Sequence, residues 1–228
     1  MNKFTIVLAT MAGCNAVAHA EIIDFSGLAN GEIVNHQFAP LGVHISAINP
    51  NRSFDLAGIF DTNASGTRDN DLEGPWSMGN MPINTDMGNI LIIQENDQGI
   101  PDDEGSRPAG ALFFNFDNLM STFGFDILDL DSTAAEISSI EFFRNGTYIS
   151  GMGFDQFEAG GAYDVNAIFG NNSINRIDPF TIAGGFDEVM ISVGGSMGFD
   201  NIQFTQVPAP GALALLGLGA AVGIRRRR

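Results

Sequence analysis

The sequence predicts an all-β domain of the sandwich or barrel type. Short runs rich in Phe, Ile and Val alternate with Gly, Asn, Asp and Pro, a spacing typical of sheets built from short strands. Few windows show the 3.6-residue apolar period of a surface helix. Between an apolar N-terminus and an apolar C-terminus lie about 185 residues, enough for one domain with its own core.

The expected strands follow one another along this central part. They cover residues 21–25, 34–38, 43–48, 54–60, 90–95, 111–116, 122–128, 137–143, 148–152, 189–193 and 199–204. The continuous apolar run within 90–95 indicates burial on both faces, and the alternation of large residues in 123–127 indicates one buried face. Asn145-Gly146 between two expected strands predicts a two-residue hairpin turn. Residues 61–89 and 97–108 are expected loops.

The N-terminus is typical of a secretory signal peptide, expected as a signal helix over residues 1–20. Lys3 supplies the positive charge, residues 4–12 are apolar, and Ala-His-Ala at 18–20 fits a cleavage site before Glu21. An alternative is a lipoprotein box over residues 11–14, in which Cys14 would carry the lipid. Cys14 is the one cysteine, so cleavage before Glu21 leaves a domain without a disulfide.

The central domain is strongly acidic. Within residues 21–206, five arginines stand against 27 acidic residues, a formal net charge of −22. Such a surface repels nucleic acid and anionic membranes and attracts cations. The acids then serve as a solubility coat, as a cation site, or as both.

Four aspartates are the candidate calcium site: Asp61, Asp69, Asp71 and Asp200. Calcium takes six to eight oxygen ligands, mostly from carboxylates and carbonyls. Asp69 and Asp71 lie two residues apart in one loop, Asp61 ends the preceding strand, and Asp200 begins the last one. The spacing is not that of an EF-hand, and the alternative is a set of solvated loop carboxylates. A second acidic group, at 97 and 102–104, is expected to be a charged loop.

Trp76 is the candidate ligand-binding residue. It is the one tryptophan and lies in the polar loop 73–76, where a partner could stack on its ring; the alternative is a plug packed against the sheet edge. No catalytic residue is expected, because the chain has no nucleophile elbow, zinc motif or phosphate loop. His36 and His44 are expected strand histidines, and no carboxylate pair is singled out for glycoside hydrolysis.

Three features follow one another at the C-terminus. A Val-Pro-Ala-Pro motif at 207–210 precedes an uncharged run at 211–224 and four final arginines. As a helix, residues 209–224 would span roughly 24 Å, which is short for a hydrocarbon core of about 30 Å unless the arginines reach toward the headgroups. Because basic residues stay on the cytoplasmic side, residues 21–206 should lie outside. The sorting residues are Val207, Pro208, Pro210, Arg225, Arg226, Arg227 and Arg228.

This tail resembles the PEP-CTERM sorting signal of Gram-negative bacteria, with Ala209 in place of the usual Glu. The resemblance implies an exosortase-type processing enzyme as partner, cleavage near the Pro motif, and an organism that makes an exopolysaccharide or biofilm matrix. The alternative is a plain C-terminal anchor that is never cut. Residues 23–25, 41–46, 60–62, 69–72 and 198–204 also resemble domains found ahead of such tails, which implies an antiparallel, jelly-roll-like and lectin-like β-sandwich.

The leading hypothesis is a signal peptide at 1–20, a β-sandwich domain at 21–206 and a sorting signal at 207–228. The protein would be a non-enzymatic exported component of the cell surface or exopolysaccharide matrix, anchored transiently in the inner membrane by a C-terminal hydrophobic helix. Calcium is the expected cofactor, and no nucleic acid is expected as a partner. A calcium-dependent carbohydrate-binding module is the alternative, and a secreted hydrolase is the third hypothesis.

Overall fold

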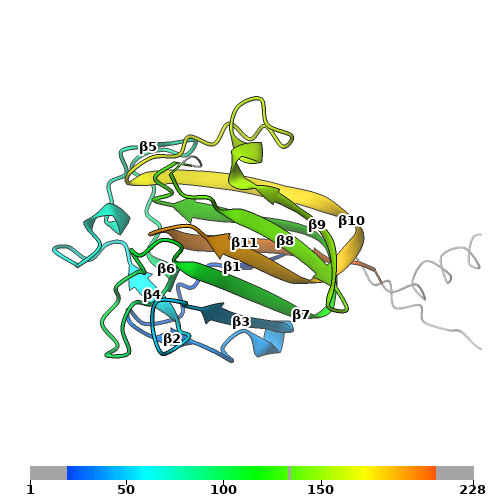
Figure 1. Cartoon of the computed structure of the whole chain (residues 1–228), viewed down its shortest axis with the longest axis horizontal. Coiled ribbons are helices and arrows are strands. Elements are labelled where there is room, and N and C mark those ends of the chain that lie inside the picture. Colours follow the sequence, from blue (N-terminus) through cyan, green and yellow to red (C-terminus); the bar gives the residue numbers. More distant parts are fainter. Residues whose placement is uncertain (1–19, 133–134, 209–228) are drawn as a thin grey trace, which may run out of the picture.

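The computed structural model describes residues 20–132 and 135–208, which form an 11-stranded β-sheet with three short 3-10 helices (Figure 1). The strands are β1 (Ala20–Ile23), β2 (Ile33–Val34), β3 (Val43–Ile48), β4 (Ala57–Asp61), β5 (Met78–Gly79), β6 (Asn89–Ile93), β7 (Gly110–Leu128), β8 (Ser139–Arg144), β9 (Thr147–Gly153), β10 (Ser173–Val193) and β11 (Gly198–Gln206). The 3-10 helices are η1 (Ala39–Leu41), η2 (Asn70–Leu72) and η3 (Phe154–Phe157).

The strand order confirms an all-β, antiparallel fold. Neighbouring strands run β2-β4-β6-β11-β7-β10-β8-β9, with β1 beside β11, β3 beside β7 and β5 beside β10. Among the pairs of named strands in the described residues, only the short β5–β10 pair is parallel. Neighbours in space are mostly distant in sequence, so long-range pairing builds this sheet.

Two long strands, β7 and β10, run through both parts of the sheet: one part around β11, the other around β3 and β8. Residues 122–128 of β7 pair with β11 and with 174–181 of β10. Residues 110–115 of β7 pair with 188–193 of β10, and residues 111–116 pair with β3. The register of β10 shifts at Gly184 and Gly185, whose φ angles of 85° and 74° favour glycine. The two strands expected at 111–116 and 122–128 are therefore one strand. The first half of β10 was not predicted because Pro and Gly interrupt its pattern.

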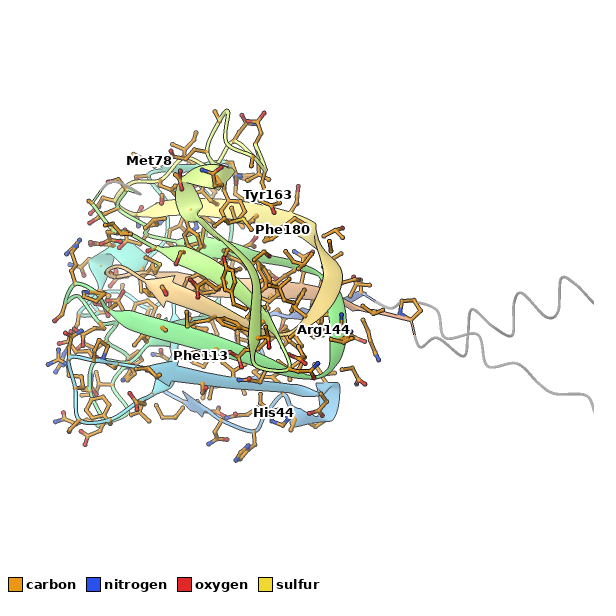
Figure 2. The ribbon with its side chains drawn as sticks, turned by 45° about the vertical axis from the view of Figure 1, so that its right-hand side comes forward. His44, Met78, Phe113, Arg144, Tyr163 and Phe180 are labelled. Carbon is orange, nitrogen blue, oxygen red and sulfur yellow. The ribbon has the colours of Figure 1, made fainter. Side chains whose placement is uncertain are left out.

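The main core is built from phenylalanine rings on both parts of the sheet. Phe123 makes edge-to-face contacts with Phe114, Phe142 and Phe186, at ring-centroid distances of 5.7, 6.2 and 6.2 Å. Figure 2 shows Tyr163 beside Phe180, whose ring centroid is 4.7 Å away. Such pairs add to the free energy gained from burying the rings. The phenylalanine rings therefore make up much of the core.

The predicted hairpin turn is confirmed. Asn145 and Gly146 connect β8 to β9 with φ angles of 50° and 70°. Positive φ at both central residues is typical of the type I′ turn, which Asn-Gly favours. The expected signal helix and C-terminal hydrophobic helix lie outside the described residues. Within 20–132 and 135–208, no helix is both long and apolar enough to cross a bilayer.

Candidate functional site

The acidic loops meet at one end of the molecule, at the left of Figure 1. Three connections contribute to this end: the one between β4 and β6, the one between β6 and β7, and the turn between β10 and β11. Their side chains contact one another through Asp69, Asp103 and Ser196. The β1 start and the β11 end lie together at the opposite end of the sheet, because Ala20 pairs with Thr205.

Three carboxyls and one hydroxyl form a linked group, and we call Asp69, Asp103, Asp129 and Ser196 the Ser196 cluster. Asp103 and Asp129 are buried, and Asp69 is half-buried. Ser196 Oγ lies 2.5 Å from Asp103 Oδ2 and 3.3 Å from Asp129 Oδ2. The Asp103 N–H donates to Asp69 Oδ2 at 3.0 Å, and the Asn172 N–H donates to Asp129 Oδ1 at 2.5 Å. The cluster thus ties η2, the β6–β7 loop and the end of β7 together.

Burial makes the carboxyls of the Ser196 cluster weak acids. It raises the pKa of Asp103 well above its usual range, and the neighbouring charge of Asp69 raises it further. Burial likewise raises the pKa of Asp69, and it raises the pKa of Asp129 to about 7. Desolvation disfavours the charged form of a carboxyl. Asp129 in the folded protein therefore binds its proton more tightly than an exposed aspartate would.

The four predicted calcium ligands do not come together. Asp69 belongs to the Ser196 cluster, and Asp71 on η2 lies close enough for its charge to raise the pKa of Asp129. Asp61 ends β4, where its Oδ1 accepts the Asn63 N–H at 2.9 Å. Asp200 lies on β11 with different partners. Across the described ranges, no three His, Cys, Asp or Glu side chains are placed to hold a metal ion.

Asp200 is part of a second polar group, formed with Asp126, Arg176 and Asn201. Arg176 donates to both oxygens of Asp126, from Nε at 2.8 Å and from Nη2 at 2.7 Å. Asn201 Nδ2 bridges Asp126 Oδ2 at 2.8 Å and Asp200 Oδ2 at 3.1 Å. Within the described ranges, Asp200 Oδ1 is buried without a hydrogen-bond partner, and burial raises the pKa of Asp200 to about 8.

The expected charged loop is largely turned inward, so that prediction was wrong for residues 102–104. Asp97 is exposed, but Asp102, Asp103 and Glu104 are buried. Arginine neutralises two of them: Arg68 Nη1 lies 2.6 Å from Asp102 Oδ2, and Arg52 Nε lies 3.0 Å from Glu104 Oε2. Charge density in the sequence did not reveal these partners, which are more than 30 residues away.

Trp76 is buried. Its side chain is 2% exposed and packs in a second, smaller core with Phe60, Leu72 and Ile90. The indole Nε1–H donates to the carbonyl oxygen of Thr85 at 2.9 Å. With its ring covered, Trp76 fits the packing alternative and offers no face for stacking a sugar.

The sorting motif begins on the folded sheet. β11 ends at Gln206, and the Val207 N–H donates to the carbonyl oxygen of Leu119 at 2.8 Å. A hollow of about 580 Å³ lies beside Val207 and Pro208 and is also lined by Arg144. Figure 2 shows Arg144 at the right-hand end of the sheet. Pro210 and residues 225–228 lie outside the described residues.

Comparison with known proteins identifies the tail. Residues 206–228 match the PEP-CTERM protein-sorting motif, as the sequence resemblance implied. This match implies that an exosortase processes the chain and that the chain is exported to the cell surface. No curated protein matches the chain.

Two solved structures are similar in part. The K2 cleaved adhesin domain of Lys-gingipain shares 12% identity, covers 82% of this chain and 100% of its own, and has a TM-score of 0.43. The enzymatically active domain of tailspike protein 4 from bacteriophage CBA120 shares 13% identity, with a TM-score of 0.35. This second match covers 80% of the present chain but 22% of the tailspike chain.

Proposed function

We propose that this chain is a non-enzymatic protein of the cell surface or the exopolysaccharide matrix, delivered there by exosortase processing. The sorting motif at 206–228 is the observation that supports this proposal most directly. The anchoring of residues 211–224 in the inner membrane before processing belongs to the same proposal. So does a jelly-roll-like sandwich, in which the two halves of β7 and β10 would face each other across the phenylalanine core.

The structure supports a mature protein that remains folded without the tail. The phenylalanine core lies within the described residues, and the tail leaves directly from the end of β11. The domain surface carries most of the 27 acidic residues, which keep it soluble and hold it away from anionic membranes. A folded, acidic, releasable domain suits a protein that acts outside the cell.

Deletion of residues 225–228 tests this proposal. The basic cluster is the cytoplasmic end of the sorting signal. Without it, the uncharged run loses the positive charges that hold one of its ends on the cytoplasmic side of the membrane. We expect the protein that lacks residues 225–228 to keep the rest of its tail and to fail to reach the cell surface. Mass spectrometry would measure the first result and cell fractionation the second. Replacement of the four residues by lysines preserves the charge and serves as the matched control. Normal delivery of the deleted protein would refute the proposal.

Calcium binding, alone or as part of a carbohydrate-binding module, is the second candidate. It is favoured by the position of Asp69 and Asp71 beside the buried carboxyls of Asp103 and Asp129. In this proposal the carboxyls of the Ser196 cluster release their protons and rearrange around the ion.

A thermal melt of residues 21–206 with calcium or with chelator tests this second candidate. Calcium at ~100 times its dissociation constant adds about 2.7 kcal/mol to the free energy of unfolding, which should raise Tm by several degrees. Asp129→Asn should remove the rise, whereas Asp61→Asn, outside the cluster, should keep it. Equal melts in calcium and in ionic-strength-matched NaCl would exclude a site. A positive melt should be followed by glycan-array binding with and without chelator.

A further inference from the structure

The segment just ahead of the Pro motif is part of the sheet. Thr205 pairs with Thr122 and Gln206 with Met120 on β7, and the Val207 N–H is bonded to Leu119. The matched sorting motif starts at residue 206. The sheet and the sorting motif therefore overlap, with no flexible linker between them.

Side chains reinforce this attachment. Ser121 Oγ donates to the carbonyl oxygen of Thr205 at 3.1 Å. Val207 packs over the bend of β10, where its Cγ2 lies 3.1 Å from the position that a Cβ on Gly185 would take. Because Gly185 has a φ of 74° and no side chain, Val207 can approach the backbone closely.

A processing enzyme needs the same backbone groups that the sheet uses. Enzymes and receptors commonly hold an extended peptide through its main-chain N–H and C=O groups, as an added strand. The groups at 205–207 are already bonded to β7 or packed on β10. An exosortase that binds the chain on both sides of a cut near the Pro motif would therefore compete with the folded domain for these residues.

We propose that residues 205–207 are a release segment, which detaches from β7 before the exosortase cuts the chain. The strength of this attachment then sets the rate of processing, so the folded domain regulates its own sorting. This inference rests on the proposed exosortase processing. Strand ends open locally more easily than strand centres, which makes such a release compatible with an intact core.

Removal of the signal peptide would loosen the same segment. On the side of β11 away from β7, Thr205 pairs with Ala20. Cleavage before Glu21 takes Ala20 away and leaves Thr205 attached to β7 alone. Release of residues 205–207 should then be easier in the chain that has already lost its signal peptide.

A reversible cross-link tests the release directly. Thr122→Cys with Thr205→Cys joins two residues that are partners on β7 and β11, and a disulfide there should hold the segment in place. In the full-length chain, expressed with its exosortase, we expect loss of the tail to slow by at least about tenfold and to recover on addition of reductant. The matched control is Ser139→Cys with Ser192→Cys, which joins partners on β8 and β10 away from the tail.

Insertion of Gly-Ser-Gly-Ser between Gln206 and Val207 completes the test. In the cross-linked variant this linker frees Val207 and should restore processing; in the otherwise unchanged chain it should speed processing. Processing of the cross-linked chain at the normal rate, or no effect of the linker in either chain, would overturn the inference. If the unchanged chain keeps its tail while the exosortase processes another substrate, the proposed function fails instead.

Discussion

Asp200 and Asp126 lie opposite each other on β11 and β7, but their side chains have different partners. Asp126 accepts two hydrogen bonds from the Arg176 guanidinium, while one buried oxygen of Asp200 has no hydrogen-bond partner among the residues that the structure describes. Burial raises the pKa of Asp200 to about 8. An unfolded aspartate has a pKa near 3.9. The folded state thus holds a proton here that the unfolded state loses above pH ~4.

Linkage gives the sign of the resulting pH dependence. Where the folded state binds more protons than the unfolded state, the free energy of unfolding falls as pH rises. The contribution of Asp200 is therefore fully present below pH ~4 and declines as pH rises toward about 8. Asp129, with a pKa of about 7, changes stability in the same direction.

Asp200→Asn should stabilise the domain at high pH. Asn resembles the protonated carboxyl, so the variant avoids the cost of a buried charge. We expect a higher free energy of unfolding than in the unchanged domain at pH 9, by about 1–3 kcal/mol, and a smaller difference at pH 5, measured by urea melts.

The matched control is Asp126→Asn. This change leaves the Arg176 guanidinium without its charged partner and should destabilise the domain at both pH values. If Asp200→Asn destabilises the domain equally at pH 5 and pH 9, Asp200 is charged in the folded state and the assignment of its proton is wrong.

The β5 strand shows how one element depends on one glycine. Gly79 has a φ of 137°, and a Cβ there would lie 1.7 Å from the carbonyl oxygen of Ile174 on β10. This close approach is the parallel β5–β10 pairing itself. The β5–β10 pairing closes the loop that contains Trp76, which is itself part of the second core. The sequence shows a Gly at this position but not the strand that it approaches.

Gly79→Ala should separate β5 from β10. Steric overlap and a φ that L-residues avoid should together lower the free energy of unfolding by at least about 1–3 kcal/mol. Urea melts followed by the fluorescence of Trp76, the one tryptophan, would measure the loss. Gly27→Ala is the control, since a Cβ there meets nothing within 4 Å. Equal melts for the two variants would show that the β5 pairing contributes little.

At the scale of the whole molecule, net charge opposes compactness. The domain carries five arginines and 27 acidic residues, and several of the acids are buried together at one end. Repulsion between like charges destabilises a compact state, and salt screens it.

Added salt should therefore stabilise the domain at neutral pH. We expect Tm to rise between low salt and 0.5 M NaCl, by about 2–4 °C for each kcal/mol of repulsion relieved. At pH 4 many carboxylates are protonated, so the same salt step should have a smaller effect. A Tm that does not change with salt at pH 7.5 would show that the ion pairs with arginine already offset the repulsion between the acidic side chains.

The sequence by itself determined the features that depend on neighbouring residues. Strand periodicity predicted the all-β class, and Asn145-Gly146 predicted its hairpin. The Pro motif, the uncharged run and the final arginines, in that sequence order, predicted the sorting motif. Only the tertiary structure decided which acids are buried and what they meet. Ser196 and Asp103 are 93 residues apart, and Asn201 and Asp126 are 75 apart. Local propensity carries no information over such separations, because these contacts exist only once long-range strand pairing has brought the loops together.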